Sequence, residues 1–350
     1  MESISRGGCT TAWHPSKRRM PSEAHQLAAQ LDVAVSISVP TPSRPKPDHG
    51  VLRWIVDIST WSPAPEEFDF LLSTLQEEEQ AKVVRYKFEM DKKRALVSRL
   101  LQRRACAEAT GVKQSEVIIQ RTKGAKPYMA NRPHADSLPN WNFNVSHEGN
   151  YVAIAAEPSL LCGVDVAAPE QVRSKAGRSL ESIFQLFKDQ CTEKEWRYIR
   201  SCGPSESAME NAFRKHWSLK EAYTKARGDG LGFEFKKCEF VIHPTEGEQV
   251  EVATVTVEGT PLPLWKFYIQ PAGANHWLSV ARGPPTDVVD AFGVFTKTFR
   301  RPVLSADEMR QHLERPESSF EAKYIRELVP QEMLQLYLNL VPGAMARCSE

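Results

Sequence analysis

The chain has 350 residues, enough for about two domains of ordinary size, and its 41% hydrophobic and 25% charged residues are typical of a soluble globular protein. The formal net charge of +1 gives no overall field favouring nucleic acid or an anionic membrane, and no run of about 18 apolar residues occurs that could span a bilayer. The cysteines are scattered without a Cys-x-x-Cys pair, which argues against a disulfide framework or a structural zinc site and favours a reducing compartment.

The first 50 residues differ in composition from those that follow. They are rich in Ser, Pro, Thr and Ala, contain Lys17-Arg18-Arg19, and lack the apolar core of a secretory signal. We expect residues 1–50 to be a disordered extension, because the prolines between 40 and 47 would break an amphipathic helix. A mitochondrial or plastid transit peptide is the alternative, so the expected compartment is the cytosol, with the mitochondrion or plastid as the other candidate.

Regular structure is predicted to begin at Val51, where alternating apolar residues indicate a strand over 51–58. The elements expected next are, in order, a helix over 68–75, a helical stretch over 77–109 that stops at Gly111, a strand at 117–119 and a loop at 121–127.

The pattern is clearer from Trp141, where apolar residues alternate with Asn142, Asn144 and Ser146. Residues 147–150 have the composition of a turn, and strands are predicted on either side of it and again at 161–166. We expect these three strands to form an antiparallel meander.

The second half is predicted to be helical over 179–226, with an interruption at 201–204. Strands are expected after it at 238–242, 252–257, 264–269 and 277–281. In each half a helix that stops at a glycine leads into a strand, which suggests an α+β fold of two similar lobes. The predicted divisions are the extension 1–50, lobes over 51–158 and 159–283, and a helical or partly disordered appendage over 284–350.

Three segments carry residues suited to chemistry: Asn144–His147, Gly163–Val166 and Trp217–Lys225. Each alone has an ordinary structural explanation, such as turn chemistry, a bonded core residue or an exposed ion pair. Together they indicate more, because Asp165 faces away from its flanking valines, and a carboxylate inside an apolar strand is costly unless it is paired or bound to metal. Glu221 continues a partly apolar helical stripe, so Asp165 and Glu221 would make a small oxygen-ligand site of the kind that Mg²⁺ prefers.

These segments, in this order, resemble the signature of the 4′-phosphopantetheinyl transferase superfamily, of the larger two-lobed type. The Gly-Val-Asp strand and the Trp-x-x-Lys-Glu-Ala-x-x-Lys helix are diagnostic together. The resemblance covers about residues 53–282 and extends through Gln120–Thr122, Lys126-Pro127, Asn142–Asn144 and Gly230–Glu234.

The resemblance implies a pseudo-twofold α+β fold with antiparallel sheets and packed helices. It implies a Mg²⁺-dependent enzyme, a holo-acyl-carrier-protein synthase. Such an enzyme transfers 4′-phosphopantetheine from coenzyme A to a serine of an acyl or peptidyl carrier protein and releases adenosine 3′,5′-bisphosphate. The expected carriers are of the fatty-acid, polyketide or peptide-synthesis type, or a carrier domain of an aminoadipate reductase. A single chain could form the whole site as a monomer.

The resemblance also implies roles for individual residues. Asp165 and Glu221 would hold Mg²⁺, Glu221 would take the proton of the carrier serine, and Lys225 would stabilise the departing adenosine bisphosphate. The other expected coenzyme A contacts are Lys82, Arg121, Thr122, Lys123, Gly124, Ala125, Lys126, Asn144, Val145, Ser146, His147 and Lys220.

Three features leave alternatives open. Many relatives have a second acid where this chain has Ala167, so water or Glu148 would complete the metal shell. The basic residues between Lys82 and Arg104 form either a solvated face or a docking surface for an acidic carrier protein, with nucleic acid the least favoured partner. A non-catalytic coenzyme A-binding protein on the same fold is the alternative function, and retention of both carboxylates disfavours it.

Overall fold

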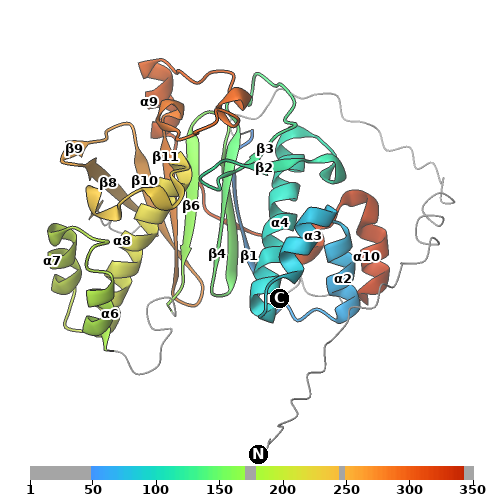
Figure 1. The fold of residues 1–350 in the computed structure, drawn as a ribbon, viewed down its shortest axis with the longest axis horizontal. Helices are drawn as coiled ribbons and strands as arrows, with labels where there is room; N and C mark the ends of the chain where they lie inside the picture. Colours follow the sequence, from blue (N-terminus) through green and yellow to red (C-terminus); the bar gives the residue numbers. More distant parts are fainter. Residues whose placement is uncertain (1–48, 170–178, 244–248, 343–350) are drawn as a thin grey trace, which may run out of the picture. The chain divides into compact units, whose positions relative to one another are not determined.

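The computed structural model describes residues 49–169, 179–243 and 249–342 (Figure 1). The prediction for residues 1–50 therefore falls almost entirely outside the described residues, as does the end of the predicted appendage. None of the helices in the described part of the chain combines the length and apolar content needed to cross a membrane.

The N-terminal lobe is a mixed sheet covered by helices on one face (Figure 1). Its strand order is β12-β1-β5-β4, with β12 parallel to β1 and the other pairs antiparallel. The strands are β1 (Leu52–Asp57), β4 (Asn142–Glu148), β5 (Tyr151–Glu157) and β12 (Glu321–Ala322), and a separate hairpin pairs β2 (Ile119–Arg121) with β3 (Pro127–Met129). The helices are α2 (Pro65–Ser73), α3 (Glu77–Val84), α4 (Glu89–Thr110) and the 3₁₀ turn η1 (Gln114–Glu116).

The predicted helical stretch over 77–109 is two helices rather than one. Helix α3 ends at Val84, and α4 starts after Phe88, whose backbone is extended (φ −94°, ψ 138°). It ends where predicted, because Gly111 adopts the left-handed conformation at φ 73°, which glycine reaches without steric cost. The strand predicted at 117–119 begins later, at Ile119, because residues 117 and 118, which follow η1, belong to no helix or strand.

The C-terminal lobe is an antiparallel sheet of order β6-β11-β10-β8-β7, with β9 paired to β8. Helix α8 packs on β6 and β11 and ends at Gly228 in the left-handed region, as α4 does at Gly111. The strands are β6 (Leu161–Ala167), β7 (Cys238–His243), β8 (Glu251–Val257), β9 (Thr260–Pro261), β10 (Lys266–Ala272) and β11 (His276–Gly283). The helices are α6 (Leu180–Leu186), α7 (Glu193–Ser201), α8 (Glu206–Arg227), η2 (Gly230–Gly232) and η3 (Phe235–Lys237). The predicted α+β class with antiparallel sheets and packed helices is confirmed.

The predicted meander of three strands is wrong in its third member. Strand β6 does not pair with β5; it is the edge strand of the other sheet, where it pairs with β11. Its free edge instead faces β4, and three β4 side chains accept hydrogen bonds from its backbone. Asn142 accepts from the Cys162 N–H (3.0 Å), Asn144 from Val164 (3.0 Å) and Ser146 from Val166 (3.2 Å). We call these three bonds the seam.

The seam explains the alternating pattern of β4. Phe143 points the other way, into the core of the N-terminal lobe, while the polar residues face a neighbouring strand rather than solvent. Side-chain oxygens thereby replace the backbone carbonyls that a continuous sheet would offer to β6, and the buried N–H groups of β6 are satisfied. Small apolar residues, among them Ala153, Ala155 and Val164, fill the space between the two sheets.

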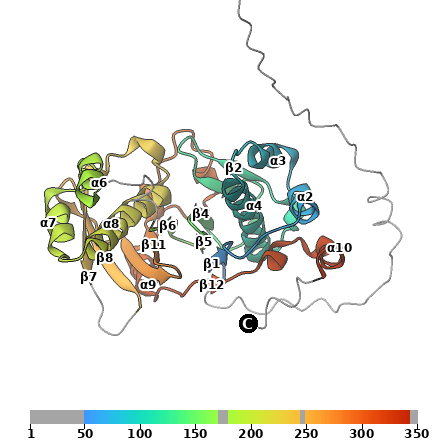
Figure 2. The same cartoon turned by 90° about the horizontal axis from the view of Figure 1, so that it is seen from below.

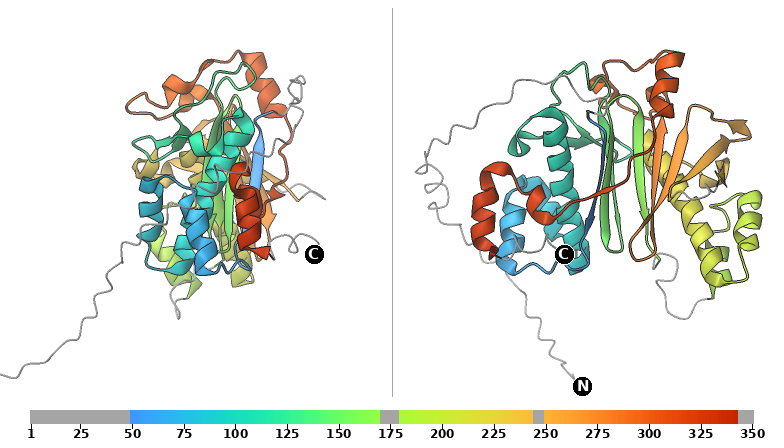
Figure 3. Two further views of the ribbon diagram at one scale, coloured as in Figure 1. Left: turned by 90° about the vertical axis from the view of Figure 1, so that its right-hand side faces the viewer. Right: turned by 180° about the vertical axis from the view of Figure 1, so that it is seen from behind.

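The described residues 284–342 are integrated into both lobes. Helix α9 packs against Leu160 at the C-terminal lobe, and the chain then crosses behind the sheets to add β12 beside β1 (Figures 2 and 3). Leu328 and Tyr337 belong to the core of the N-terminal lobe. The elements of this segment are η4 (Pro285–Asp287), η5 (Thr296–Thr298), α9 (Ala306–Glu314), η6 (Ile325–Leu328), η7 (Gln331–Met333) and α10 (Leu334–Leu340).

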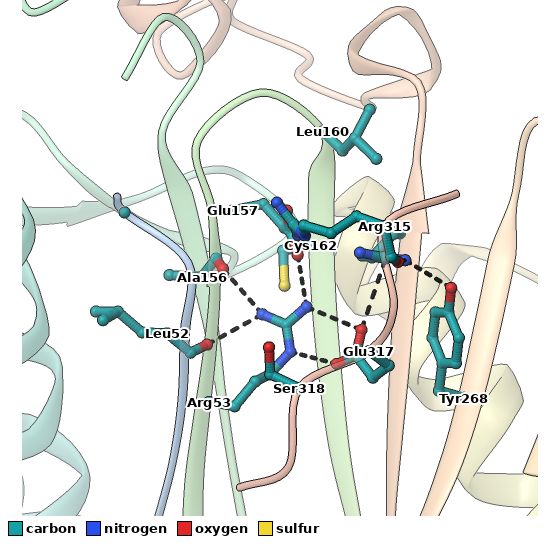
Figure 4. A network of polar contacts seen from close by, with 12 residues as sticks. Leu52, Arg53, Ala156, Glu157, Leu160, Cys162, Tyr268, Arg315, Glu317 and Ser318 are labelled. Atoms are coloured by element: carbon teal, nitrogen blue, oxygen red, sulfur yellow. Dashed lines mark hydrogen bonds and ion pairs between the residues drawn. The ribbon is translucent and has the colours of Figure 1, made fainter. Parts of the chain in front are cut away.

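Where this segment crosses between the lobes, a buried network of charges holds it (Figure 4). Arg53 of β1 pairs with Glu157 at 2.5 Å and with Glu317 of the crossing segment. Arg315 pairs with Glu157 at 2.6 Å, and Arg282 of β11 lies 3.6 Å from Glu317. Glu157 is ionised in this setting: burial alone would raise its pKa, but the three arginines lower it below its ordinary value.

Candidate active site

A cavity of about 550 Å³ lies where the seam, α8 and the β2–β3 loop meet. One wall comes from Arg121 and Gly124 to Pro127 of the loop and from Asn144 and Val145 of β4. The opposite wall comes from α8 and the segment that follows it. The residues on this second wall are Gln190, Trp217, Glu221, Thr224, Lys225, Gly230, Leu231, Phe233 and Phe235.

Asp165 lies in the middle of β6, against Lys225 of the cavity wall, and is 4% exposed. The Lys225 ammonium is 2.6 Å from its Oδ1, and the Ser146 hydroxyl donates to the same oxygen at 3.1 Å. Its Oδ2 is buried and has no hydrogen-bond partner among the described residues. A buried carboxylate oxygen without a partner is costly, so this atom is suited to bind something that the chain itself does not supply.

Helix α8 brings Glu221 and Lys225 to Asp165 because it can approach β6 closely. Gly163 makes this possible: a Cβ at that position would lie 2.0 Å from the Ala222 carbonyl oxygen of the helix. The glycine of the Gly-Val-Asp motif is therefore explained by packing, and any larger residue would move Glu221 and Lys225 away from the carboxylate.

Ser146 of the N-terminal lobe contacts Asp165 and Lys225 of the C-terminal lobe. Its hydroxyl donates to Asp165 and accepts from the Lys225 ammonium at 3.0 Å and from the Val166 N–H. A hydroxyl has one proton and two lone pairs, so Ser146 is fully used by these contacts.

The electrostatics of the centre favour added positive charge. Burial alone would lower the pKa of Lys225, but Asp165 and Glu221 raise it above its ordinary value, so this side chain is an ammonium. Burial raises the pKa of Glu221, an effect that Lys225 opposes and Asp165 reinforces. Burial and the charge of Asp165 raise the pKa of Glu148 to about 8. Three carboxyl groups thus share the field of one lysine, an arrangement that a bound cation would relieve.

Asp165 and Glu221 are the two carboxylates that could hold a metal ion. No group of three or more His, Cys, Asp or Glu side chains with metal-binding geometry occurs in the described ranges. Ala167 is buried on the same face of β6 as Asp165, and Glu148 lies near enough for Asp165 to perturb its pKa. The side chains present therefore fit a cation that keeps several water or ligand positions, as Mg²⁺ does.

The β2–β3 loop contributes to the cavity wall, but not through every side chain. Arg121 is exposed and donates to the Ala125 carbonyl at 3.0 Å, and Ala125 itself has a positive φ of 66°. Gly124 packs on the end of α8, where a Cβ would lie 1.9 Å from the Gly228 carbonyl oxygen. Thr122 is buried and its hydroxyl accepts from the Lys126 N–H at 3.2 Å.

Lys126 lines the cavity, yet its ammonium is engaged by the protein. It donates to the carbonyls of Cys162 at 2.8 Å and Lys225 at 3.3 Å, which ties β3 to β6 and α8. Burial lowers its pKa to about 8.

Lys220 lies away from the cavity. Its ammonium is fully buried, 2.8 Å from Glu195, and it also donates to the carbonyls of Phe235 and Cys238. All three of its donors are used within the protein, which leaves none for coenzyme A.

Lys82, Lys123 and His147 do not line the cavity either. Lys82 is exposed on α3, and Lys123 is exposed in the loop. His147 follows the seam on β4; desolvation and the cations Lys225, Arg94 and Arg99 lower its pKa to about 4. It is therefore a neutral ring at physiological pH.

Some cavity residues were not singled out as site residues from the sequence. Trp217 and Phe233 fell within the quoted motifs, but their apolar character gave no sign that they would line a cavity. Gln190 and Phe235 lie outside every motif, and only tertiary packing, such as that of α7 on α8 and of the Phe235 ring on Trp217, brings them to the wall.

Two protein-family models match the chain, and they divide it where the structure passes from one sheet to the other. Residues 59–159 match a family model described as 4′-phosphopantetheinyl transferase, N-terminal, and residues 161–281 match one described as 4′-phosphopantetheinyl transferase superfamily. The boundary between the two models falls between β5 and β6, where the chain passes from one sheet to the other.

Individual proteins similar to this chain are also named phosphopantetheinyl transferases. L-aminoadipate-semialdehyde dehydrogenase-phosphopantetheinyl transferase is 34% identical in Rattus norvegicus and 33% in Homo sapiens, each over 67% of this chain and 75% of the relative. A phosphopantetheinyl transferase of Thraustochytrium is 34% identical over 67% of this chain and 79% of the relative. The chain therefore belongs to the 4′-phosphopantetheinyl transferase superfamily and is a transferase enzyme.

Proposed function

We propose that this enzyme transfers 4′-phosphopantetheine from coenzyme A to a serine of an acyl or peptidyl carrier protein, and that the reaction depends on Mg²⁺. The observation that carries this proposal is the pairing of a buried, half-satisfied carboxylate, Asp165, with Glu221 and Lys225 beside a cavity. Phosphoryl transfer needs charge neutralisation and placement more than covalent catalysis, and these groups supply both.

Asp165 and Glu221 would hold the metal ion, with Glu148 as a further candidate. When bound, Mg²⁺ supplies positive charge that neutralises the pyrophosphate oxygens of coenzyme A. The free Oδ2 of Asp165 supports this assignment, because Oδ1 is already used by Lys225 and Ser146.

Residues of the protein would transfer the proton and stabilise the leaving group. The serine oxygen of the carrier attacks the phosphorus that bears pantetheine, and the bond from that phosphorus to the oxygen bridging the two phosphates breaks. Glu221 takes the serine proton; its raised pKa makes it a better base than an ordinary carboxylate. The Lys225 ammonium stabilises the negative charge that develops on the leaving adenosine 3′,5′-bisphosphate.

The rim of the cavity would hold the nucleotide end of coenzyme A. Burial lowers the pKa of Arg121, and the cation Arg99 of α4 lowers it further, so positive charge gathers at this side. We assign the 3′-phosphate and adenosine to Arg121, Lys123 and His147 with the backbone of Gly124 and Ala125. Lys82 would be an outer contact, and Asn144 and Val145 would bound the pantetheine arm.

One chain supplies both walls of the cavity, so we expect the enzyme to act as a monomer. We also expect it in the cytosol, with a mitochondrial or plastid location as the alternative, and with no nucleic acid or membrane partner.

The experiment is to incubate the full chain with coenzyme A, Mg²⁺ and an apo carrier protein and to measure the carrier's intact mass. The phosphopantetheine adduct should form, and EDTA should prevent it until excess Mg²⁺ is restored. Glu221→Gln is the matched negative control. If several carriers of different type remain unmodified, the non-catalytic coenzyme A-binding alternative is favoured. If modification proceeds in EDTA, the metal assignment is wrong.

A further inference from the structure

A second cavity, of about 350 Å³, lies on the β2–β3 hairpin outside the site described above. Because side chains alternate along a strand, the two faces of this hairpin serve different cavities. The pair Arg121 and Pro127 lines the active-site cavity, whereas the adjacent pair Gln120 and Tyr128 lines the second one. The rest of its wall comes from the loop after β3 and from residues 294–298.

The cavity is lined and rimmed by positive charge. The cations Arg132 and Lys297 line it beside the His134 ring, and the cation Arg300 contacts that ring. Arg132 is 9% exposed, and its guanidinium donates to the carbonyls of Leu138, Pro139 and Thr298 rather than to a carboxylate. Burial and the Arg300 cation lower the pKa of Arg132 to about 10. Among the described residues, no acidic side chain pairs with any of these four groups.

Several donors here have no acceptor in the described part of the chain. The Arg300 Nε donates to His134 Nδ1 at 2.7 Å, so a neutral His134 ring carries its own proton on Nε2. The Tyr128 hydroxyl donates to Gln120 Oε1 at 2.8 Å, which leaves the Gln120 NH₂ group available. Lys297 adds an exposed ammonium. Within the described ranges, the second cavity is therefore surrounded by cations without acidic partners and by hydrogen-bond donors without acceptors. A bound anion would supply both the negative charge and the acceptors.

We propose that this cavity binds a phosphate group, as inorganic phosphate or as the phosphate monoester of a small metabolite. The donors of Gln120, His134 and Lys297 contact its oxygens, and Arg132 and Arg300 supply the surrounding field. A dianion with several acceptor oxygens matches both the number of donors and the excess charge better than a monovalent ion does. The cavity volume leaves space for a small group attached to the phosphate.

The test is calorimetric titration of the full chain with inorganic phosphate at low ionic strength. The informative variant is Lys297→Gln/Arg300→Gln, because both residues are exposed and their loss spares the buried Arg132. Its matched control is Lys236→Gln/Arg310→Gln, which removes the same charge from exposed positions on η3 and α9. We expect the control to bind phosphate like the unaltered chain and the Lys297/Arg300 variant to bind it roughly tenfold or more weakly, since charge-assisted hydrogen bonds are lost.

The variant Lys225→Gln distinguishes the two cavities. It should abolish phosphate binding in the active-site cavity and leave phosphate binding in the second cavity unchanged. Each of three results would overturn the proposal: equal affinity in the Lys297/Arg300 variant and its control, loss of all phosphate binding in Lys225→Gln, or no binding by the unaltered chain at millimolar phosphate. None of these results bears on carrier modification, so this proposal and the proposed function fail independently.

Discussion

At the scale of single residues, the two oxygens of Asp165 have different surroundings. One is held by Lys225 and Ser146, and the other has no partner among the described residues. Replacing the carboxylate by an amide of the same shape would remove one of two anionic ligands without opening a cavity. The metal should then bind more weakly while the fold survives.

We therefore expect Asp165→Asn to need at least about tenfold more Mg²⁺ for half-maximal carrier modification, because each charged ligand contributes strongly to binding a hard cation. The measurement is the rate of adduct formation against Mg²⁺ concentration. Asp287→Asn, at an acid on η4 that does not line the active-site cavity, is the control. An unchanged Mg²⁺ requirement in Asp165→Asn would remove Asp165 from the metal site.

Glu221 can be tested as the base in the same way. We expect Glu221→Gln to lower kcat by about 10²-fold or more, the usual effect of losing a general base, while the far-ultraviolet circular dichroism stays native. Glu206→Gln on the first turn of the same helix should keep near-normal turnover. Comparable kcat values for the two variants would exclude Glu221 as the proton acceptor.

Lys220 presents the opposite case, a motif residue whose surroundings are structural. Lys220→Met would leave Glu195, 1% exposed, without its cation, and should lower the free energy of unfolding by about 3–5 kcal/mol. Urea denaturation measures this. The exposed pair Lys194–Glu239 is the comparison, and Lys194→Met should cost less than about 1 kcal/mol. The KM for coenzyme A should stay unchanged in the folded fraction of Lys220→Met; a raised KM would return this lysine to the binding site.

At the scale of elements, the β4–β5 turn meets the β10–β11 turn through His276. This ring is 4% exposed; its Nδ1 faces the carbonyls of Gly273 and Ala274, and its Nε2 accepts from the Asn150 N–H at 3.4 Å. Gly149 lies so close that a Cβ there would be 2.1 Å from Nε2. The ring must therefore be neutral, and burial lowers its pKa below the ordinary value.

The sign of the pH effect follows from proton binding. Between the lowered folded pKa and the ordinary value of about 6.5, the unfolded chain binds more protons than the folded one, so stability falls as the pH falls. The contribution of His276 is complete above about pH 6.5 and can decline by up to about 1.4 kcal/mol per pH unit below it.

We expect unfolding free energies measured at pH 7.5 and 5.5 to differ more for the unaltered chain than for His276→Gln. His243→Gln, at an exposed histidine on β7, is the control and should behave like the unaltered chain. Equal pH sensitivity of the unaltered chain and His276→Gln would contradict the prediction.

Most elements could be predicted from the sequence because local signals define them. Apolar alternation gave the strands, and Gly111 and Gly228 marked the ends of α4 and α8. The partner of β6 could not be predicted, since its apolar residues fit either sheet and its pairing depends on β11, more than 100 residues later. The break before α4 also left no clear signal, because the residues on both sides have helical spacing.

The sequence was sufficient to predict that three charged residues of the site lie together, but not which other residues surround them. Asp165, Glu221 and Lys225 meet, as expected from a strand and a helix that carry charges among apolar residues. The burial of Lys220 was not visible, because its partner Glu195 lies on another helix and a lysine beside a glutamate in sequence suggests exposure. The alternation of polar residues along β4 also gave no sign that their side chains would accept hydrogen bonds from the backbone of β6.

At the scale of the whole molecule, the segment after β11 fastens the lobes to each other. Glu317 pairs with Arg53 (Figure 4) and lies 3.6 Å from Arg282. With 2% of its side chain exposed, its charge is therefore compensated on both sides. Removing one member of such a network leaves buried charges without partners, which costs far more than losing a surface pair.

Glu317→Gln should accordingly lower the free energy of unfolding by about 3–5 kcal/mol in urea denaturation. Glu314→Gln, three residues earlier and exposed at the end of α9, should lie within about 0.5 kcal/mol of the unaltered chain. Equal stability of the two variants would show that the crossing segment is not held by its charges.

The seam has a consequence for deuterium exchange along β6. The amides of Cys162, Val164 and Val166 bond to side chains of the other lobe, so the intervening amides of Gly163 and Asp165 must face β11. A fluctuation that parts the lobes without unfolding either one would release only the first set. Neighbouring amides of one strand would then exchange at two different rates, and their ratio would gauge how often the lobes separate in the folded enzyme.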